Sequence, residues 1–176
     1  MVIKILLGLV VLGVVFAVIV SMRPTDFRIT RTASIAAPAS VVFGQVNDLH
    51  KWNDWSPWAK MDPNAKNSFE GPLSGVGSKM SWDGNNKVGA GSMTITDSHP
   101  NDLVRLRLEF LKPFAATNTA EFTFTPQGQQ TLVTWSMSGK NNFMGKAIGL
   151  FMDCDKMVGG QFEQGLANMN SIVQKA

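Results

Sequence analysis

The sequence predicts a single α+β domain preceded by one membrane-spanning helix, and three features carry this prediction. The chain opens with an uncharged apolar run, its middle alternates apolar with polar residues in short segments, and its end carries an apolar stripe at helical spacing. A run of strands with helices segregated to one side is typical of α+β architecture. The length of 176 residues suits one domain with an appendage.

The first element is the apolar run 5–22, which holds no charge and is bracketed by Lys4 and Arg23. As a helix, these eighteen residues would measure about 27 Å, close to the thickness of a bilayer core. A cleaved signal peptide is the alternative, but Ala17 and Ser21 lack the spacing of a small-x-small cleavage site. The run therefore favours an uncleaved anchor.

We expect an anchor at 1–23, a linker at 24–26 and a folded domain at 27–176, with membrane contact through residues 5–22. Three arginines follow the run and would suit a weak attraction to anionic lipid: Arg23, Arg28 and Arg31. Because Lys4 and the amino terminus stand on the other side, the charges leave the orientation in the membrane undecided.

The domain begins with a predicted strand at 27–36, and Pro38 then suits the first turn of a helix. The apolar stripe of that helix consists of Val42, Phe43, Val46 and Leu49. Three tryptophans follow at helical spacing before Pro57 ends the turn: Trp52, Trp55 and Trp58. They indicate either a packed corner or an aromatic patch at a pocket rim or membrane surface.

The middle of the chain predicts antiparallel strands, each apolar on one side and polar on the other. Their expected ranges are 67–71, 77–83, 91–97, 103–111, 116–125 and 131–139. Turn residues separate them, as at Asp83-Gly84-Asn85 and Pro126-Gln127-Gly128. With the first strand, this gives a sheet of about six to seven strands whose apolar face needs a cover.

The end of the chain supplies that cover. A short helix is expected at 144–152, and Asp153 or Asp155 would cap a longer one that runs to the C-terminus. Its apolar stripe consists of Val158, Phe162, Leu166, Met169 and Val173. Three glycines interrupt this helix, either because the sheet approaches closely or because a bound molecule needs the space: Gly159, Gly160 and Gly165.

Taken together, these segments resemble the START-like, pollen-allergen-like (SRPBCC) superfamily, and within it the bacterial polyketide cyclase/dehydrase and lipid-transport family. The residues that carry the resemblance are Ile35-Ala36-Ala37-Pro38, Asp48-Leu49 with Trp52, Trp55-Ser56-Pro57-Trp58 with Asp62-Pro63, Gly75-Val76-Gly77 with Trp82, and Phe162-Glu163 with Gly165-Leu166. Together they cover residues 27–175. The resemblance implies a helix-grip fold, in which a curved antiparallel sheet wraps the C-terminal helix, and binding of apolar small molecules in the space between them. With the expected single-pass anchor, the resemblance to a bacterial family makes a bacterial cell membrane the expected location.

The sequence offers little for catalysis or for a metal. His50 and His99 are expected in solvated loops, and Cys154 has no neighbouring histidine, so neither a zinc site nor an activated thiol is expected. No cofactor is expected. Nucleic-acid binding is not expected either, because no basic run with interleaved aromatic residues occurs. A protein partner is not specified.

The inward face of the predicted sheet is instead almost wholly apolar, and alternation assigns it the residues that would contact a ligand. They are Met80, Trp82, Met93, Leu108, Phe110, Phe122, Phe124, Trp135 and Met137, with Phe162 and Leu166 from the last helix. Ligand pockets and solid cores share this composition, so it does not separate the two.

Three functions stay open. The leading hypothesis is a membrane-anchored, non-enzymatic binding module for a lipid, an isoprenoid or a polyketide-like molecule. A cyclase- or dehydratase-type enzyme would need a polar residue in the same pocket, for which Asn118, Arg107 and Asp153 are the candidates. A ligand-free interaction or scaffold domain is the third. A cavity of several hundred Å³ would favour binding, whereas a filled core would favour the scaffold.

Overall fold

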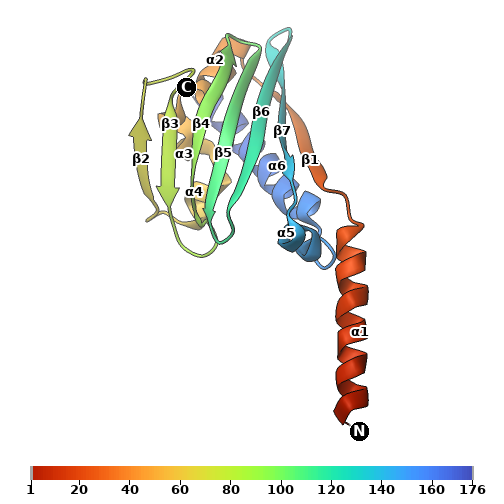
Figure 1. Ribbon diagram of the computed structural model, residues 1–176. Helices are drawn as coiled ribbons and strands as arrows, with labels where there is room; N and C mark the ends of the chain where they lie inside the picture. Colours follow the sequence, from red (N-terminus) through yellow and green to blue (C-terminus); the bar gives the residue numbers. More distant parts are fainter. Residues whose placement is uncertain (1, 176) are drawn as a thin grey trace.

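The computed structural model describes residues 2–175 and contains a curved sheet with helices on one face, from which a single long helix projects (Figure 1). The helices are α1 (Val2–Ser21), α2 (Ala39–Asn47), η1 (Leu49–Lys51), α3 (Trp52–Trp55), α4 (Pro57–Met61), α5 (Phe143–Ile148) and α6 (Cys154–Val173). The strands are β1 (Asp26–Ile35), β2 (Lys66–Glu70), β3 (Lys79–Asp83), β4 (Ala90–His99), β5 (Leu103–Lys112), β6 (Ala116–Gln127) and β7 (Gln130–Lys140). The predicted α+β helix-grip fold is confirmed.

The seven strands form one antiparallel sheet in the order β1-β7-β6-β5-β4-β3-β2. From β2 to β7 each strand pairs with the next along the chain. Strand β1 pairs with β7, so β1 and β2 form the two edges of the sheet. Two register shifts in β4, at Ala90/Gly91 and between Ile95 and Asp97, interrupt its pairing with β5. Such irregularities bend a strand and increase its twist, which suits a sheet that curves around a helix.

Alternation along the strands places the apolar side chains on the concave face, as the sequence predicts. In β5, Val104 and Leu106 are fully buried, whereas the neighbouring Arg107 is exposed. Across the β6–β7 pair, Phe122 stands opposite Trp135 and Phe124 opposite Val133, and all four side chains are buried. The sheet therefore contributes one continuous apolar surface.

Helix α6 covers this surface with the predicted stripe, and its N-cap is Asp153, whose side chain accepts a hydrogen bond from the Lys156 backbone amide. Two of its glycines mark close approaches. A Cβ at Gly165 would lie 2.9 Å from the Trp135 ring, and a Cβ at Gly159 would overlap the Arg31 guanidinium. Gly160 has open space around it. The first alternative of the sequence, close approach of the sheet, thus explains two of the three glycines.

The structure changes three details of the predicted elements. Pro57 ends α3 and also occupies the first turn of a further helix, α4, where its missing N–H costs nothing. The short helix expected at 144–152 ends at Ile148, and Gly149 follows as its C-cap. The last helix ends at Val173, short of the C-terminus.

Helix α1 stands apart from the domain, and none of its most apolar eighteen-residue stretch is buried. It is long and apolar enough to cross a membrane. It contacts the domain beside α5, where the rings of Phe16 and Phe151 stack with centroids 6.5 Å apart, and Val20 near its end is fully buried. Figure 1 shows α5 next to the end of α1 from which the chain enters the domain.

Candidate functional site: an apolar pocket between sheet and helices

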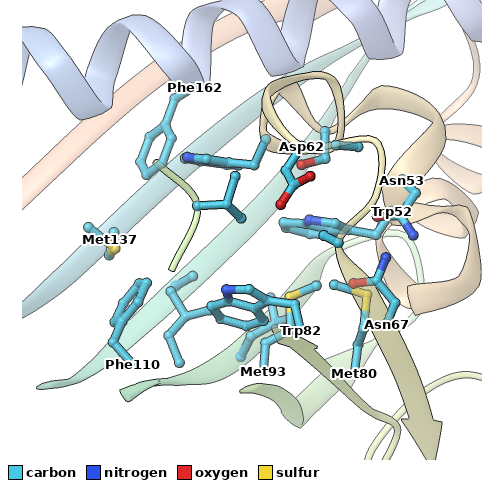
Figure 2. A pocket seen from close by; sticks show the side chains of 18 of the residues that line it. Trp52, Asn53, Asp62, Asn67, Met80, Trp82, Met93, Phe110, Met137 and Phe162 are labelled. Carbon is cyan, nitrogen blue, oxygen red and sulfur yellow. The ribbon is translucent and has the colours of Figure 1, made fainter. Parts of the chain in front are cut away.

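A partly enclosed pocket lies between the concave face of the sheet and helices α3, α4 and α6, with a cavity volume of about 520 Å³. This volume falls in the range usual for sites that hold small molecules. Figure 2 shows the pocket with Phe162 of α6 on one side and with Trp82, Met80 and Met93 of the sheet on another.

Eight of the eleven residues predicted to contact a ligand line this pocket. They are Met80, Trp82, Met93, Leu108, Phe110, Trp135, Met137 and Phe162. The other three, Phe122, Phe124 and Leu166, are buried but lie outside the lining. Phe124 meets Phe43 of α2 edge-on at 5.7 Å, and Phe122 meets Trp52 and Trp55 edge-on. At this part of the sheet α2 and α3 fill the space, so these side chains belong to solid core.

Trp135 of β7 is the centre of the aromatic packing that forms one wall. Its ring stacks on Phe162 at 4.1 Å and on Phe122 at 4.7 Å. The three predicted tryptophans all meet its ring edge-on, with centroid distances of 5.8 Å for Trp52, 5.6 Å for Trp55 and 5.9 Å for Trp58. The tryptophans are therefore a packed corner, of which Trp52 and Trp58 also line the pocket.

The pocket has a polar side that the sequence did not reveal. Asn53 of α3, Asp62 after α4 and Asn67 of β2 line it, and Figure 2 shows them gathered near Trp52, away from Phe162 and Met137. The Asp62 carboxylate accepts hydrogen bonds from the backbone amides of Asn85, at 2.6 Å, and of Asn64, at 3.1 Å. This carboxylate therefore fixes two loops while it forms part of the pocket wall.

The three residues considered for a catalytic role, Asn118, Arg107 and Asp153, lie outside the lining of the pocket. Arg107 is exposed on the outer face of the sheet in an ion pair with Glu109, and Asp153 caps α6. Asn118 is buried, and its amide nitrogen lies 3.9 Å from the sulfur of Met137. His50 and His99 pair with Asp48 and Asp97 outside the pocket lining.

A second hollow, of about 790 Å³, lies beside α5 and the ends of β1, β6 and β7. Met137 and Val158 line both this hollow and the pocket, so the two meet at these side chains. Asn118 and Asp153 belong to this second hollow. Apolar residues of α5 and of the segment after it form much of its wall, among them Met144, Ile148, Phe151 and Met152.

Arg31 joins the start of α6 to β1. Its guanidinium donates to Glu163 at 2.6 Å and to Asp155 at 2.8 Å, and the absent side chain at Gly159 leaves room for it. The hydrogen bond from Arg31 lowers the pKa of Asp155, and the bonds to Asp155 and Glu163 raise the pKa of Arg31. Arg31 thus holds the helix that covers the pocket, in place of the lipid contact that its position in the sequence suggested.

These features define a helix-grip protein with an internal, mainly apolar pocket. The sequence profile of the family described as polyketide cyclase/dehydrase and lipid transport matches residues 26–174, and the chain belongs to that family. The resemblance noted from the sequence is confirmed. Comparison with curated protein sequences gave no significant match.

Solved structures agree on the fold at low sequence identity. Protein MLL2253 from Mesorhizobium loti is 15% identical with a TM-score of 0.63, over 85% of this chain and 98% of that one. Protein CV1439 from Chromobacterium violaceum is 14% identical with a TM-score of 0.59, over 86% and 98%. The major latex-like protein 151 from Panax ginseng is 14% identical with a TM-score of 0.58, over 84% and 97%. The family and the pocket both point to a fold suited to hydrophobic ligands.

Proposed function

We propose that this chain is a membrane-anchored module that binds an apolar small molecule between its sheet and α6. The observation that carries the proposal is the pocket of about 520 Å³, whose wall is formed largely by Trp, Phe, Met and Leu side chains. Interiors of folded proteins are otherwise close-packed, so a cavity of this size calls for an occupant. A ligand-free scaffold would need no such space.

The distribution of polar groups suggests the chemistry of the occupant. Asn53, Asp62 and Asn67 occupy one side of the pocket, and Phe110, Met137 and Phe162 lie away from them. A molecule with a long apolar body and a small hydrogen-bonding end would suit both sides. Lipids, isoprenoids and polyketide-like molecules share this form.

The anchor is part of the proposal, as is the division into anchor, linker and domain at 1–23, 24–26 and 27–176. The exposure of α1 argues against a core helix, and its length suits a bilayer. A signal peptide has the same apolar character, so the two are distinguished by whether the mature chain keeps this helix.

Native mass spectrometry of the full chain in a mild detergent tests the binding proposal. We expect the wild-type protein to carry a small apolar molecule, and Leu108→Trp to carry much less because the larger ring would fill the pocket. Leu73→Trp is the matched control, since Leu73 is 74% exposed in the loop after β2 and lies outside the pocket lining. Equal occupancy in the two variants, or an empty wild-type protein, would refute the proposal.

A cyclase- or dehydratase-type reaction is the second candidate, because the Asp62 carboxylate forms part of the pocket wall. Asp62→Asn removes the ionisable group and keeps one of the two oxygens that accept backbone amide hydrogen bonds, from Asn64 and from Asn85. If the chain were an enzyme, the molecule bound to this variant would differ in mass from the wild-type occupant, for example by one water. Identical occupants in both proteins would favour binding alone.

A further inference from the structure

Exposed large apolar side chains gather at the end of the domain that carries α5. Phe143 and Phe151 are 53% and 80% exposed, Met144 and Met152 each 49%, and Phe114 of the β5–β6 hairpin 54%. Elsewhere in the described part of the domain, the exposed large apolar residues are Val41, Phe69, Leu73, Val76, Leu111 of β5 and Met157 of α6. A contiguous exposed apolar patch on a soluble domain marks a surface that meets a partner or a membrane.

The contact with α1 indicates that a membrane, rather than a protein partner, covers the patch. Phe151 stacks on Phe16, which precedes the end of α1 at Ser21 by five residues, about 7.5 Å at the helical rise. Phe16 lies within the apolar run, so a bilayer that surrounds this run also reaches Phe151. Lys146 of α5 has its ammonium 3.5 Å from the Ser21 carbonyl oxygen, level with the end of the run and suited to the headgroup layer.

The second hollow adjoins both this patch and the pocket. Its wall includes the exposed apolar residues Phe114, Met144, Phe151 and Met152, which belong to this patch. Charged residues from β1, β7 and the start of α6 form another part of the wall: Arg28, Lys140, Asp153 and Asp155. Its inner end is formed by Met137 and Val158, which also line the pocket. Side chains rather than backbone therefore separate the hollow from the pocket. Val158 is partly exposed, and the flexible side chain of Met137 can adapt to an apolar group that passes it.

We propose that the α5 end of the domain is seated in the membrane surface and that the second hollow is the route between the bilayer and the pocket. The ligand is then a membrane-resident amphiphile, such as a fatty acid or a related single-chain lipid, and the bilayer rather than a protein covers the patch. This inference rests on the proposed function, because it adds the source of the ligand to a pocket already proposed to bind one.

Photo-crosslinking in vesicles tests the route. The full chain is reconstituted in phosphatidylcholine and phosphatidylglycerol vesicles that contain a fatty acid with a diazirine in its chain. After irradiation, we expect crosslinked peptides from the second hollow, around Phe114 and Ile148, and from the pocket, around Met93 and Leu108. Val158→Trp would narrow the junction, and crosslinks in the pocket should fall several-fold while those in the hollow persist.

The possible outcomes distinguish a failure of the proposed route from a failure of the proposed binding in the pocket. Crosslinks in the pocket without any in the hollow would overturn the route and leave the proposed function intact. Crosslinks confined to α1 would overturn the route and the single-chain lipid as the ligand, and the mass-spectrometry experiment would then decide whether the pocket binds another apolar molecule. Because the wild-type pattern alone gives these answers, a poorly folded Val158→Trp variant would not obscure them.

A fluorescent label tests the seating independently. In a Cys154→Ser background, an environment-sensitive dye is attached at Phe151→Cys or, as the control, at Leu73→Cys, which is similarly exposed but lies in the β2–β3 loop. Lipids with a nitroxide on the acyl chain should quench the label at 151 strongly and the label at 73 little. Equal quenching at the two positions would overturn the seating.

Discussion

At the scale of single residues, replacement by alanine should affect the stability of the fold differently at two adjacent glycines of α6. Gly160 has open space around its Cα, so Gly160→Ala should stabilise the fold by about 0.5–1 kcal/mol through helix propensity. Gly159→Ala has the same propensity gain, but its methyl group would displace the Arg31 guanidinium from Asp155 and Glu163. We therefore expect Gly159→Ala to be the less stable of the two.

Thermal unfolding of the full chain in one detergent, followed by circular dichroism, compares the two variants directly. A midpoint for Gly159→Ala equal to that for Gly160→Ala would mean that Arg31 moves aside without loss. In that case the ion pairs would contribute nothing measurable to the attachment of α6.

The residues of the pocket were predictable from the sequence only in part. Alternation along a strand decides which side chains face inward, because the side-chain period of a strand is two. It does not decide where helices fill the inward face, so Phe122 and Phe124 could not be distinguished from Leu108 and Phe110. The polar side was missed because Asn53, Asp62 and Asn67 come from a helix, a turn and a strand that meet only in the fold.

At the scale of elements, the attachment of α6 to β1 should depend on pH through Asp155. Its pKa is lower in the folded chain than the ordinary value of 3.8 because it accepts hydrogen bonds from Arg31. The stabilisation is therefore complete above pH 3.8 and is lost as the pH falls through the lowered pKa. Asp155→Asn should lower the unfolding midpoint at neutral pH and differ little from the wild type in strong acid.

Unfolding midpoints of the wild type and Asp155→Asn across the acid range measure this difference. Asp102→Asn is a matched control, because Asp102 lies in an exposed turn outside the ion pairs of the described residues. A deficit for Asp155→Asn that stays constant down to strong acid would show that its cause is not the charge of Asp155.

The elements themselves were largely predictable, whereas their contacts were not. Strand periodicity, turn residues and the Asp153 cap each act within a few residues, and the structure confirms the elements that they predict. The bond from Arg31 to Glu163 joins residues 132 positions apart, and nothing local in the sequence indicates it. Arg31 also lies close enough to the apolar run to suggest lipid contact instead.

At the scale of the whole molecule, the pocket adjoins the second hollow at Met137 and Val158, and the second hollow is lined by Phe151, which contacts α1. Figure 1 places α5 between the sheet and the projecting helix, and the stack of Phe16 on Phe151 fixes this arrangement. A cleaved signal peptide would leave the apolar patch around α5 without its neighbour. An uncleaved anchor instead holds the patch at the bilayer at no further entropic cost of association.

This difference leads to a prediction about the mature chain. We expect the protein to fractionate with membranes, to resist extraction by high salt or alkali, and to have an intact mass that includes residues 1–22. Val11→Arg places a charge in the middle of α1, where it disfavours insertion by about 2.5–3.5 kcal/mol, and should shift part of the protein to the soluble fraction. Val11→Leu is the matched control and should stay in the membrane. A mature chain that begins after Met22 would identify α1 as a signal peptide, and the exposed side chains around α5 would then need another partner.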